Sequence, residues 1–219
     1  MRFIQNFLQD AIYLVPAILI SLTVHEFCHS YAAHLLGDPT AKNAGRLTLS
    51  PLSHLDPVGT ICLLFFRFGW AKPVPVNPLY FRNPKKGMAL TAAAGPASNI
   101  VLALVSMFCF YACLYFGGYT AGAVLGYLFQ FFYLMTMINI GLAVFNMLPI
   151  APLDGSKIFA ALLPQQMYFQ LLQYERYIQP VLFLLLFTRI LSTPLSWLQG
   201  KVFSLLQFIV LPIANLLFN

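Results

Sequence analysis

Two histidines and a glutamate, in the run His-Glu-x-x-His from His25 to His29, have the spacing of a metal-dependent hydrolase helix. On an α-helix, residues four apart lie on one face, so both imidazoles can ligate a single ion while Glu26 points at water bound to that ion. The run lies inside an apolar stretch that begins near Ala11. Ionisable side chains at membrane depth are costly and need pairing, a metal or a wet cavity. We therefore expect hydrolysis at membrane depth, with one zinc ion per chain.

A catalytic zinc usually takes three protein ligands and leaves one position for water, so a third ligand is needed. His34 lies five residues past His29 and falls on a different helix face. Among the acidic residues, Asp56 and Asp154 remain candidates. Asp154 is favoured because it follows an apolar run that two prolines and a glycine interrupt, which lets a carboxylate turn inward.

Composition sets the environment of the chain. Of its 219 residues, 60% are hydrophobic and 8% are charged, whereas soluble domains carry about 25% charged residues. The net charge of +6 forms no aromatic-interleaved basic cluster, so we expect no nucleic-acid partner. The prediction is an all-α membrane protein, a polytopic bundle of about five or six helices in one domain, 1–219. Its catalytic core covers about 8–160 and its C-terminal helices about 164–219. The predicted spans are 8–36, 88–116, 121–148, 178–195 and 202–217.

The segment 38–87, between the first two predicted spans, is different in kind. It holds seven of the fifteen prolines, which no continuous helix tolerates. We expect a short β-rich or re-entrant region here, with 57–68 too apolar for water and too short to span as a helix. Residues 70–78 read as extended chain. Two interpretations remain open for them: a stiff connector at the membrane interface, or a sheet edge that pairs with extended substrate.

Charge distribution predicts the orientation of the chain. Most basic residues fall between the first and second predicted spans, whereas the link 117–120 carries no charge. Cytoplasmic loops carry an excess of Lys and Arg. We therefore expect a multi-pass protein of the cell membrane whose active site faces the cytoplasm, because the histidines occupy the later half of the first span and Asp154 follows the third. An amphipathic surface helix is expected at 164–179.

Several motifs occur together in an order that resembles the site-2 proteases, zinc metalloproteases that cleave transmembrane segments. The run from His25 to His29 is followed by Gly95-Pro-Ala-Ser-Asn99, then by Asn146 and by Leu153-Asp-Gly155. The stretches 50–59 and 69–78 look like those of the compact bacterial and archaeal branch, and the resemblance covers about 15–160. We see no PDZ or CBS module in the sequence.

This resemblance implies a function and a set of roles. His25, His29 and Asp154 would hold Zn²⁺, Glu26 would be the catalytic acid and base, and Asn146 would face the active site. The implied activity is zinc-dependent endopeptidase cleavage of transmembrane proteins within the lipid bilayer, as in regulated intramembrane proteolysis; nothing indicates the oligomeric state.

Two polar residues keep open roles. Asn99 is either structural or close to the metal ligands, and His54 is either a group near the site or a polar turn residue. The alternative function is a transporter or channel that passes ions or protons through the His, Glu and Asp cluster. A transporter with internal repeats would show matching halves, and the sequence shows none.

Overall fold

The computed structural model describes residues 2–59, 69–117, 122–164 and 190–218, together with 62, 120, 167, 177–178, 180–182, 184–186 and 188, and it describes side chains from residue 11 onward. Four long helices dominate this part of the chain: α1 (Arg2–Leu35), α4 (Pro84–Tyr115), α5 (Ala123–Asn146) and α8 (Ser192–Phe218). All four are long and apolar enough to cross a bilayer, the first over Ala11–Leu35. The shortest of these stretches, 24 residues, extends about 36 Å at 1.5 Å per residue, against a hydrocarbon core of about 30 Å.

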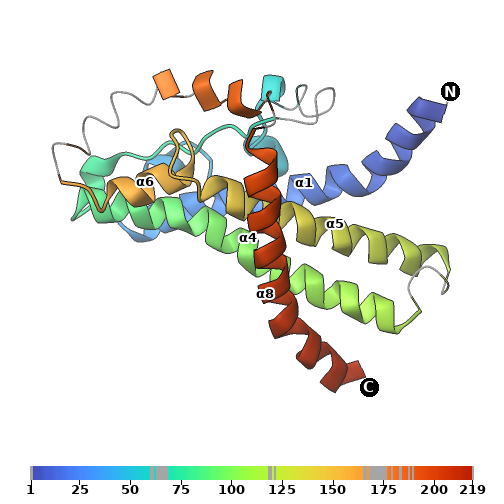
Figure 1. The fold of residues 1–219 in the computed structure, drawn as a ribbon. Helices are drawn as coiled ribbons and strands as arrows, with labels where there is room; N and C mark the ends of the chain where they lie inside the picture. Colours follow the sequence, from blue (N-terminus) through green and yellow to red (C-terminus); the bar gives the residue numbers. More distant parts are fainter. Residues whose placement is uncertain are drawn as a thin grey trace.

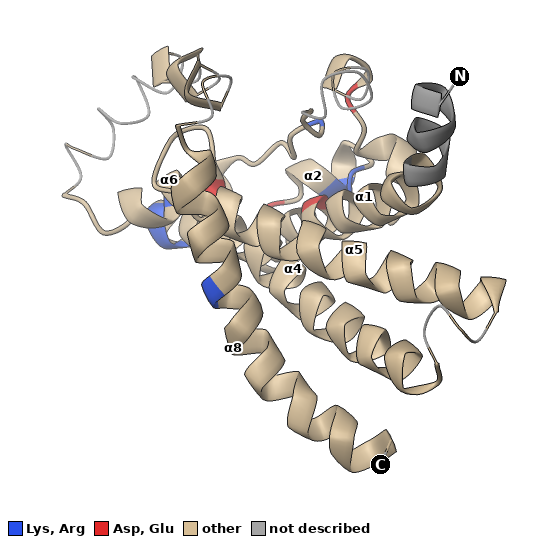
Figure 2. Cartoon of the chain, turned by 45° about the vertical axis from the view of Figure 1, so that its right-hand side comes forward, with Lys and Arg blue, Asp and Glu red and all other residues tan. Residues whose placement is uncertain are grey.

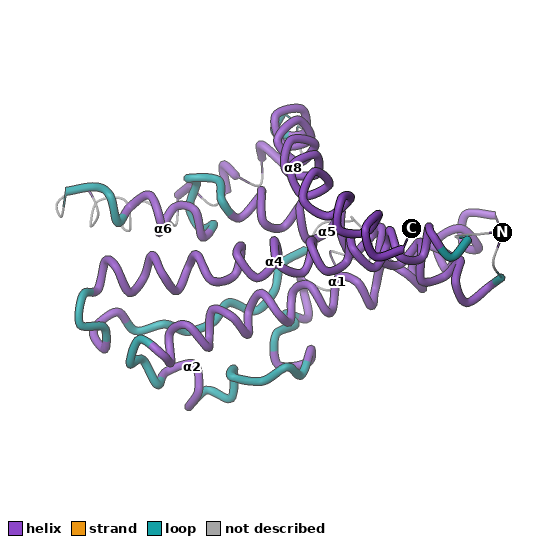
Figure 3. The backbone as a smooth tube through the Cα atoms, turned by 90° about the horizontal axis from the view of Figure 1, so that it is seen from below, coloured by secondary structure: helices purple, strands orange, loops and turns teal. Residues whose placement is uncertain are grey.

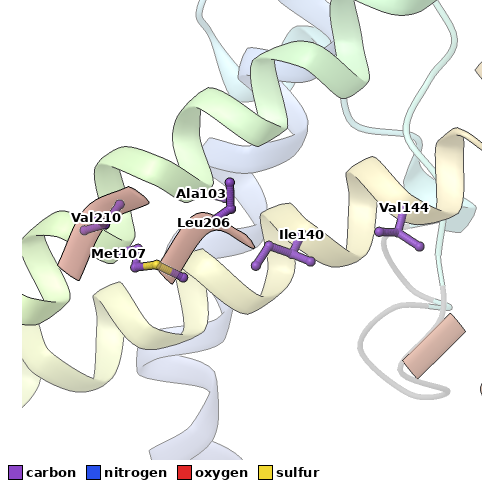
Figure 4. Packing of buried hydrophobic residues seen from close by; sticks show 6 residues of the cluster. All are labelled: Ala103, Met107, Ile140, Val144, Leu206 and Val210. Carbon is purple, nitrogen blue, oxygen red and sulfur yellow. The ribbon is translucent and has the colours of Figure 1, made fainter. Parts of the chain in front are cut away.

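Helices α1, α4 and α5 run side by side along most of their length, and α8 crosses α4 and α5 (Figures 1 and 3). A hydrophobic cluster joins α4, α5 and α8, as Figure 4 shows, and its buried members are Ala103, Met107, Ile140, Val144, Leu206 and Val210. Lipid tails are as apolar as these side chains, so close van der Waals packing rather than escape from water holds such helices together. The three-helix unit of α1, α4 and α5 is what positions the site.

Charged residues gather at one end of this bundle. Among the described residues, Figure 2 places Lys, Arg, Asp and Glu on the half that carries α2 (Thr40–Asn43) and α6 (Asp154–Ala160), whereas the far ends of α4 and α5 have none. The helix ends near the 117–120 link therefore differ in charge from the ends near α6, in line with the charge pattern of the sequence.

The predicted β-rich character of 38–87 is not confirmed. The described residues of this segment contain α2, the 3₁₀ turns η1 (Pro51–Ser53) and η2 (Pro78–Tyr80), and an isolated antiparallel bridge between Leu55 and Ala71, with no strand. Proline removes amide donors, so a ladder cannot extend through this sequence. Most of the apolar piece 57–68 lies outside the described residues, so its predicted re-entrant form stays a prediction.

Residues 71–77 form an extended segment, here called the strap, that is tied to the bundle at both ends. The Lys72 amide donates to the His54 carbonyl (2.8 Å), and the Asn77 amide donates to Oδ2 of Asp38 (2.8 Å). The guanidinium of Arg46 donates to the Lys72 carbonyl. Both Asp38 and Arg46 are buried, and buried charged groups persist only when hydrogen-bonded in this way.

The C-terminal part differs from the prediction. The expected break between spans 178–195 and 202–217 is wrong, because α8 runs without interruption through Ser192–Phe218 and contains Pro212. Pro194 sits in the first turn of α8, where a missing amide donor breaks no intrahelical bond. The predicted surface helix 164–179 falls largely outside the described residues, and 178–191 is described except for residues 179, 183, 187 and 189.

Candidate active site

Helix α1 carries His25 and His29 one turn apart, as the spacing predicts, and turns both imidazoles toward α4 and α6. The two side chains are nearly enclosed, at 4% and 7% exposure. Their Nε2 atoms lie 3.0 Å apart, with the ring planes close to perpendicular. Two ring nitrogens from one helix therefore point at a common position.

The third group at this position is Asp154, the first residue of α6. Its Oδ2 lies 3.2 Å from Nε2 of His25 and 3.1 Å from Nε2 of His29. The turn that returns the chain from α5 to α6 is tight: a Cβ at Gly155 would lie 2.4 Å from the carbonyl oxygens of Met147 and Leu148. Glycine is therefore required next to Asp154 for this carboxylate to reach α1.

The second nitrogen of each imidazole is held by α4. Nδ1 of His29 lies 2.7 Å from the carbonyl oxygen of Thr91, and Nδ1 of His25 lies 2.6 Å from Oδ1 of Asn99. A backbone carbonyl only accepts hydrogen bonds, so His29 must carry its proton on Nδ1, which leaves the Nε2 lone pair free. Histidine ligands in metal sites commonly donate their other N–H in this way.

The three converging atoms fit a zinc ion. Ligands at about 2.0–2.1 Å from one tetrahedral ion lie about 3.3 Å from each other, and here the three separations are 3.0, 3.1 and 3.2 Å. The site therefore presents a carboxylate and two imidazoles, which is a ligand set that suits zinc.

Gly95, in α4, lies directly against the two histidines. A Cβ at this position would be 2.4 Å from Nε2 and 2.5 Å from Cε1 of His29, and 2.6 Å from Cε1 of His25. No residue other than glycine fits beneath the imidazoles. The Gly-Pro motif of the sequence thus has a steric role that the sequence reading did not assign.

A cavity of about 830 Å³ opens beside the ligand cluster, and both Glu26 and Asn146 line it. The strap forms one wall with Val74 and Val76, and α8 contributes Gln199. The cavity thus combines apolar walls with a few polar groups near the three ligands, as ligand sites generally do.

The remaining predicted residues are placed as follows. The side-chain amide of Asn146 donates to the Leu142 carbonyl of its own helix (3.1 Å). His54 is buried but does not line the cavity, and its Nε2 donates to the Thr48 carbonyl (2.8 Å), so it behaves as a turn residue. Asp56 accepts from the Gly59 amide (2.7 Å) and is not part of the ligand group found among the described residues.

The sequence reading missed Asn139, an amide in α5 with 0% exposure that contacts Asn99. A signal was available in the sequence, since an amide within an apolar span needs a polar partner. Ser21 of α1 joins the same cluster and is also fully buried.

Comparisons with known proteins agree with this geometry. The family model "Peptidase family M50" matches residues 116–188. "Putative zinc metalloprotease YwhC" of Bacillus subtilis is 41% identical over 185 residues, 84% of this chain and 84% of the relative. "Putative zinc metalloprotease Rip2" is 29% identical over 152 residues in Mycolicibacterium smegmatis and 32% identical over 152 residues in Mycobacterium tuberculosis; this chain spans about half of each Rip2 protein, 54%.

No solved structure matches this chain. The relationship to YwhC extends over most of both sequences. Two imidazoles from the membrane helix α1 and a carboxylate from α6 converge on one position, which is what a zinc-dependent peptidase needs. The chain belongs to peptidase family M50, the family of the site-2 proteases, and is a metalloendopeptidase of the multi-pass membrane class.

Proposed function

We propose that this chain is a zinc-dependent intramembrane endopeptidase that hydrolyses peptide bonds within or near transmembrane segments of other membrane proteins. One observation carries the proposal: His25, His29 and Asp154 direct three ligand atoms to one point, and two of these ligands lie inside the apolar span Ala11–Leu35. Because the chain belongs to a peptidase family, we prefer this function to the alternative of a transporter or channel.

In this proposal His25, His29 and Asp154 hold one zinc ion. Bound zinc supplies a Lewis acid, which makes water more acidic and a peptide carbonyl more electrophilic. The chain orients this chemistry through the Thr91 carbonyl and the Asn99 amide, which fix the two imidazoles.

Glu26 is the proposed acid and base. It follows His25 directly, lines the cavity and is half-buried, so its carboxylate can reach water held beside the ligands. Glu26 takes a proton from the attacking water as the new carbon–oxygen bond forms, and delivers it to the amide nitrogen as the carbon–nitrogen bond breaks. Asn146 lines the same cavity and is proposed to hydrogen-bond the substrate carbonyl.

The substrate must change conformation before cleavage. A helical segment hides each carbonyl in a hydrogen bond to the amide four residues on, so local unwinding precedes attack. The strap lines the cavity with extended backbone, beside which an unwound segment can lie. Substrates with helix-breaking residues are therefore favoured.

The proposed orientation places the ligand cluster toward the cytoplasm. The described charges gather at the α6 end of the bundle (Figure 2), and positive residues mark the cytoplasmic side. We also propose that the chain forms one domain and that residues before α8 contribute a further span.

The Glu26→Gln variant tests this function. The assay uses purified full-length chain in proteoliposomes and a single-span reporter protein with glycines at the centre of its transmembrane segment. General acid–base catalysis contributes about 10²–10⁴-fold, so we expect hydrolysis to fall by at least that factor while the zinc content stays at one per chain. An unchanged cleavage rate would rule out the role of Glu26. The His34→Gln variant is the matched control, because His34 does not line the cavity, and it should cleave normally.

A further inference from the structure

Asn139 makes three hydrogen bonds in the interior of the bundle, where α1, α4 and α5 meet. Its Oδ1 accepts from Nδ2 of Asn99 (2.7 Å), and its Nδ2 donates to the carbonyl oxygen of Met135 (2.8 Å) and to Oγ of Ser21 (2.8 Å). Asn99, Asn139 and Ser21 all have 0% exposure. Their side-chain orientations are therefore decided by each other rather than by solvent.

One atom in this series of hydrogen bonds can act only as an acceptor. The Met135 carbonyl can only accept a hydrogen bond, so the Asn139 side chain must turn its NH₂ group toward α5's own backbone. Its Oδ1 then faces Asn99, so Asn99 must donate a hydrogen bond to it from Nδ2. The Asn99 Oδ1 is left to face His25, and an oxygen that only accepts requires a proton on Nδ1 of His25.

The opposite orientation is excluded by the same atoms. Rotating Asn139 by half a turn would place its oxygen 2.8 Å from the Met135 oxygen with no hydrogen between them. Rotating Asn99 alone would place its oxygen 2.7 Å from the Asn139 oxygen with no hydrogen between them. Buried polar groups left without a partner in this way are strongly disfavoured.

Ser21 contributes less to the orientation. Its hydroxyl donates to the Ala17 carbonyl (2.7 Å) and so accepts from Asn139, but a hydroxyl can rotate and donate instead. The fixed reference is the Met135 carbonyl, four residues before Asn139 on α5.

We propose that Asn139 is a positioning residue that, through Asn99, fixes the proton of His25 on Nδ1 and so presents the Nε2 lone pair to the metal. This inference rests on the proposed metal site and adds a residue that touches neither metal nor substrate. A neutral imidazole has two tautomers, and only the one with the proton on Nδ1 can ligate through Nε2. The Met135 carbonyl of α5 thus determines which ring nitrogen of His25, on α1, is free to bind the metal.

The first experiment measures zinc affinity of the full-length chain in detergent by competition with a chromophoric chelator. Asn139→Leu keeps the approximate side-chain volume but removes the carbonyl oxygen and the NH₂ group of the amide. We expect the zinc affinity to fall about 10–100-fold, as it does when a hydrogen-bond partner of a histidine ligand is lost. Thr136→Val is the matched control, because Thr136 is buried on the same helix and, among the described residues, its hydroxyl bonds only to the Phe132 carbonyl. Ser21→Ala should also bind zinc normally, since Met135 still orients the amide.

The second experiment separates orientation from packing. In the Asn99→Asp background both carboxylate oxygens accept, so His25 receives an acceptor whichever way the side chain turns. Asn139→Leu should then cost no zinc affinity, and it should relieve the contact between the carboxylate and the Asn139 oxygen. If Asn139 only fills space, the loss in the two backgrounds would agree within about twofold, the spread of independent substitutions, and the proposal would be overturned.

A third measurement reads the tautomer directly. In the full-length chain labelled with ¹⁵N-histidine, we expect the His25 signals of a protonated Nδ1 and an unprotonated Nε2, and a mixture of tautomers in Asn139→Leu. An unchanged tautomer in a folded Asn139→Leu variant refutes the inference even if zinc binding and cleavage by the unsubstituted chain are intact. Absence of zinc binding by the unsubstituted chain would instead overturn the proposed function.

Discussion

Replacing Gly95 with alanine adds one methyl group at the closest approach of α4 to the ligands. The new carbon would lie 2.4 Å from Nε2 of His29 and 2.6 Å from Cε1 of His25. Non-bonded carbon atoms prefer separations of about 3.5–4.0 Å. The imidazoles or the helix must therefore move apart by about 1 Å, because the conflict involves rings that are already hydrogen-bonded on their other side.

A movement of this size is large for a metal site. Ligand distances in such sites tolerate about 0.2 Å of deviation, and overpacking a filled interior costs about 1–3 kcal/mol. If the strain falls on the ligands, the zinc dissociation constant rises about 5-fold to 150-fold, at 1.4 kcal/mol for each factor of ten. Activity at limiting zinc should fall in parallel.

The assay compares Gly95→Ala with Gly141→Ala in zinc affinity and in thermal unfolding of the full-length chain in detergent. Gly141 is a helical glycine of α5 whose added Cβ would lie 3.6 Å from Nε2 of Gln199, an ordinary contact. We expect Gly141→Ala to bind zinc normally. Unfolding curves with and without zinc show whether the strain affects the fold or only the ligands.

The reasoning predicts a loss specific to the ligand site. If Gly95→Ala binds zinc with the affinity of the unsubstituted chain, the imidazoles do not rest on Gly95, and the packing of α1 against α4 described above is wrong. If Gly95→Ala is destabilised in the absence of zinc and Gly141→Ala is not, the strain lies in the contact between α1 and α4 rather than in the zinc ligands.

Two further predictions concern the third ligand and the orientation. Asp154→Ala should reduce the zinc affinity, measured by chelator competition, by more than the about 10–100-fold typical of losing a hydrogen-bond partner of a ligand. Full zinc occupancy in this variant would make Asp56 the candidate third ligand instead. In a cysteine-free background, Lys85→Cys should react with a membrane-impermeant maleimide only from the cytoplasm and Tyr119→Cys only from outside, and the reverse labelling pattern would refute the proposed orientation.

Much of the site follows from local rules in the sequence. The four-residue separation of His25 and His29 places both on one helix face whatever the rest of the chain does. The apolar composition around them predicts a span, and α1 confirms it over Ala11–Leu35. Asp154 was favoured over Asp56 because prolines and a glycine interrupt the preceding run, and the structure brings Asp154 to the histidines.

Other features were beyond a local reading. The expected β-rich character of 38–87 is not confirmed, because among the described residues the strap is held by isolated hydrogen bonds to Asp38 and His54 rather than by a ladder. The expected break before residue 202 failed because Pro194 falls in the first turn of a helix, where it is tolerated, and not between two helices.

The sequence by itself determined that one apolar helix carries His25 and His29, spaced to share an ion, with the carboxylate of Glu26 between them. Only the tertiary structure decided what surrounds them: Gly95 beneath the imidazoles, the Thr91 carbonyl behind His29, and the amides of Asn99 and Asn139 behind His25. The physical reason is that spacing along one helix fixes which residues share a face, whereas contacts between helices depend on how α4 and α5 pack against α1, and no local pattern encodes that packing.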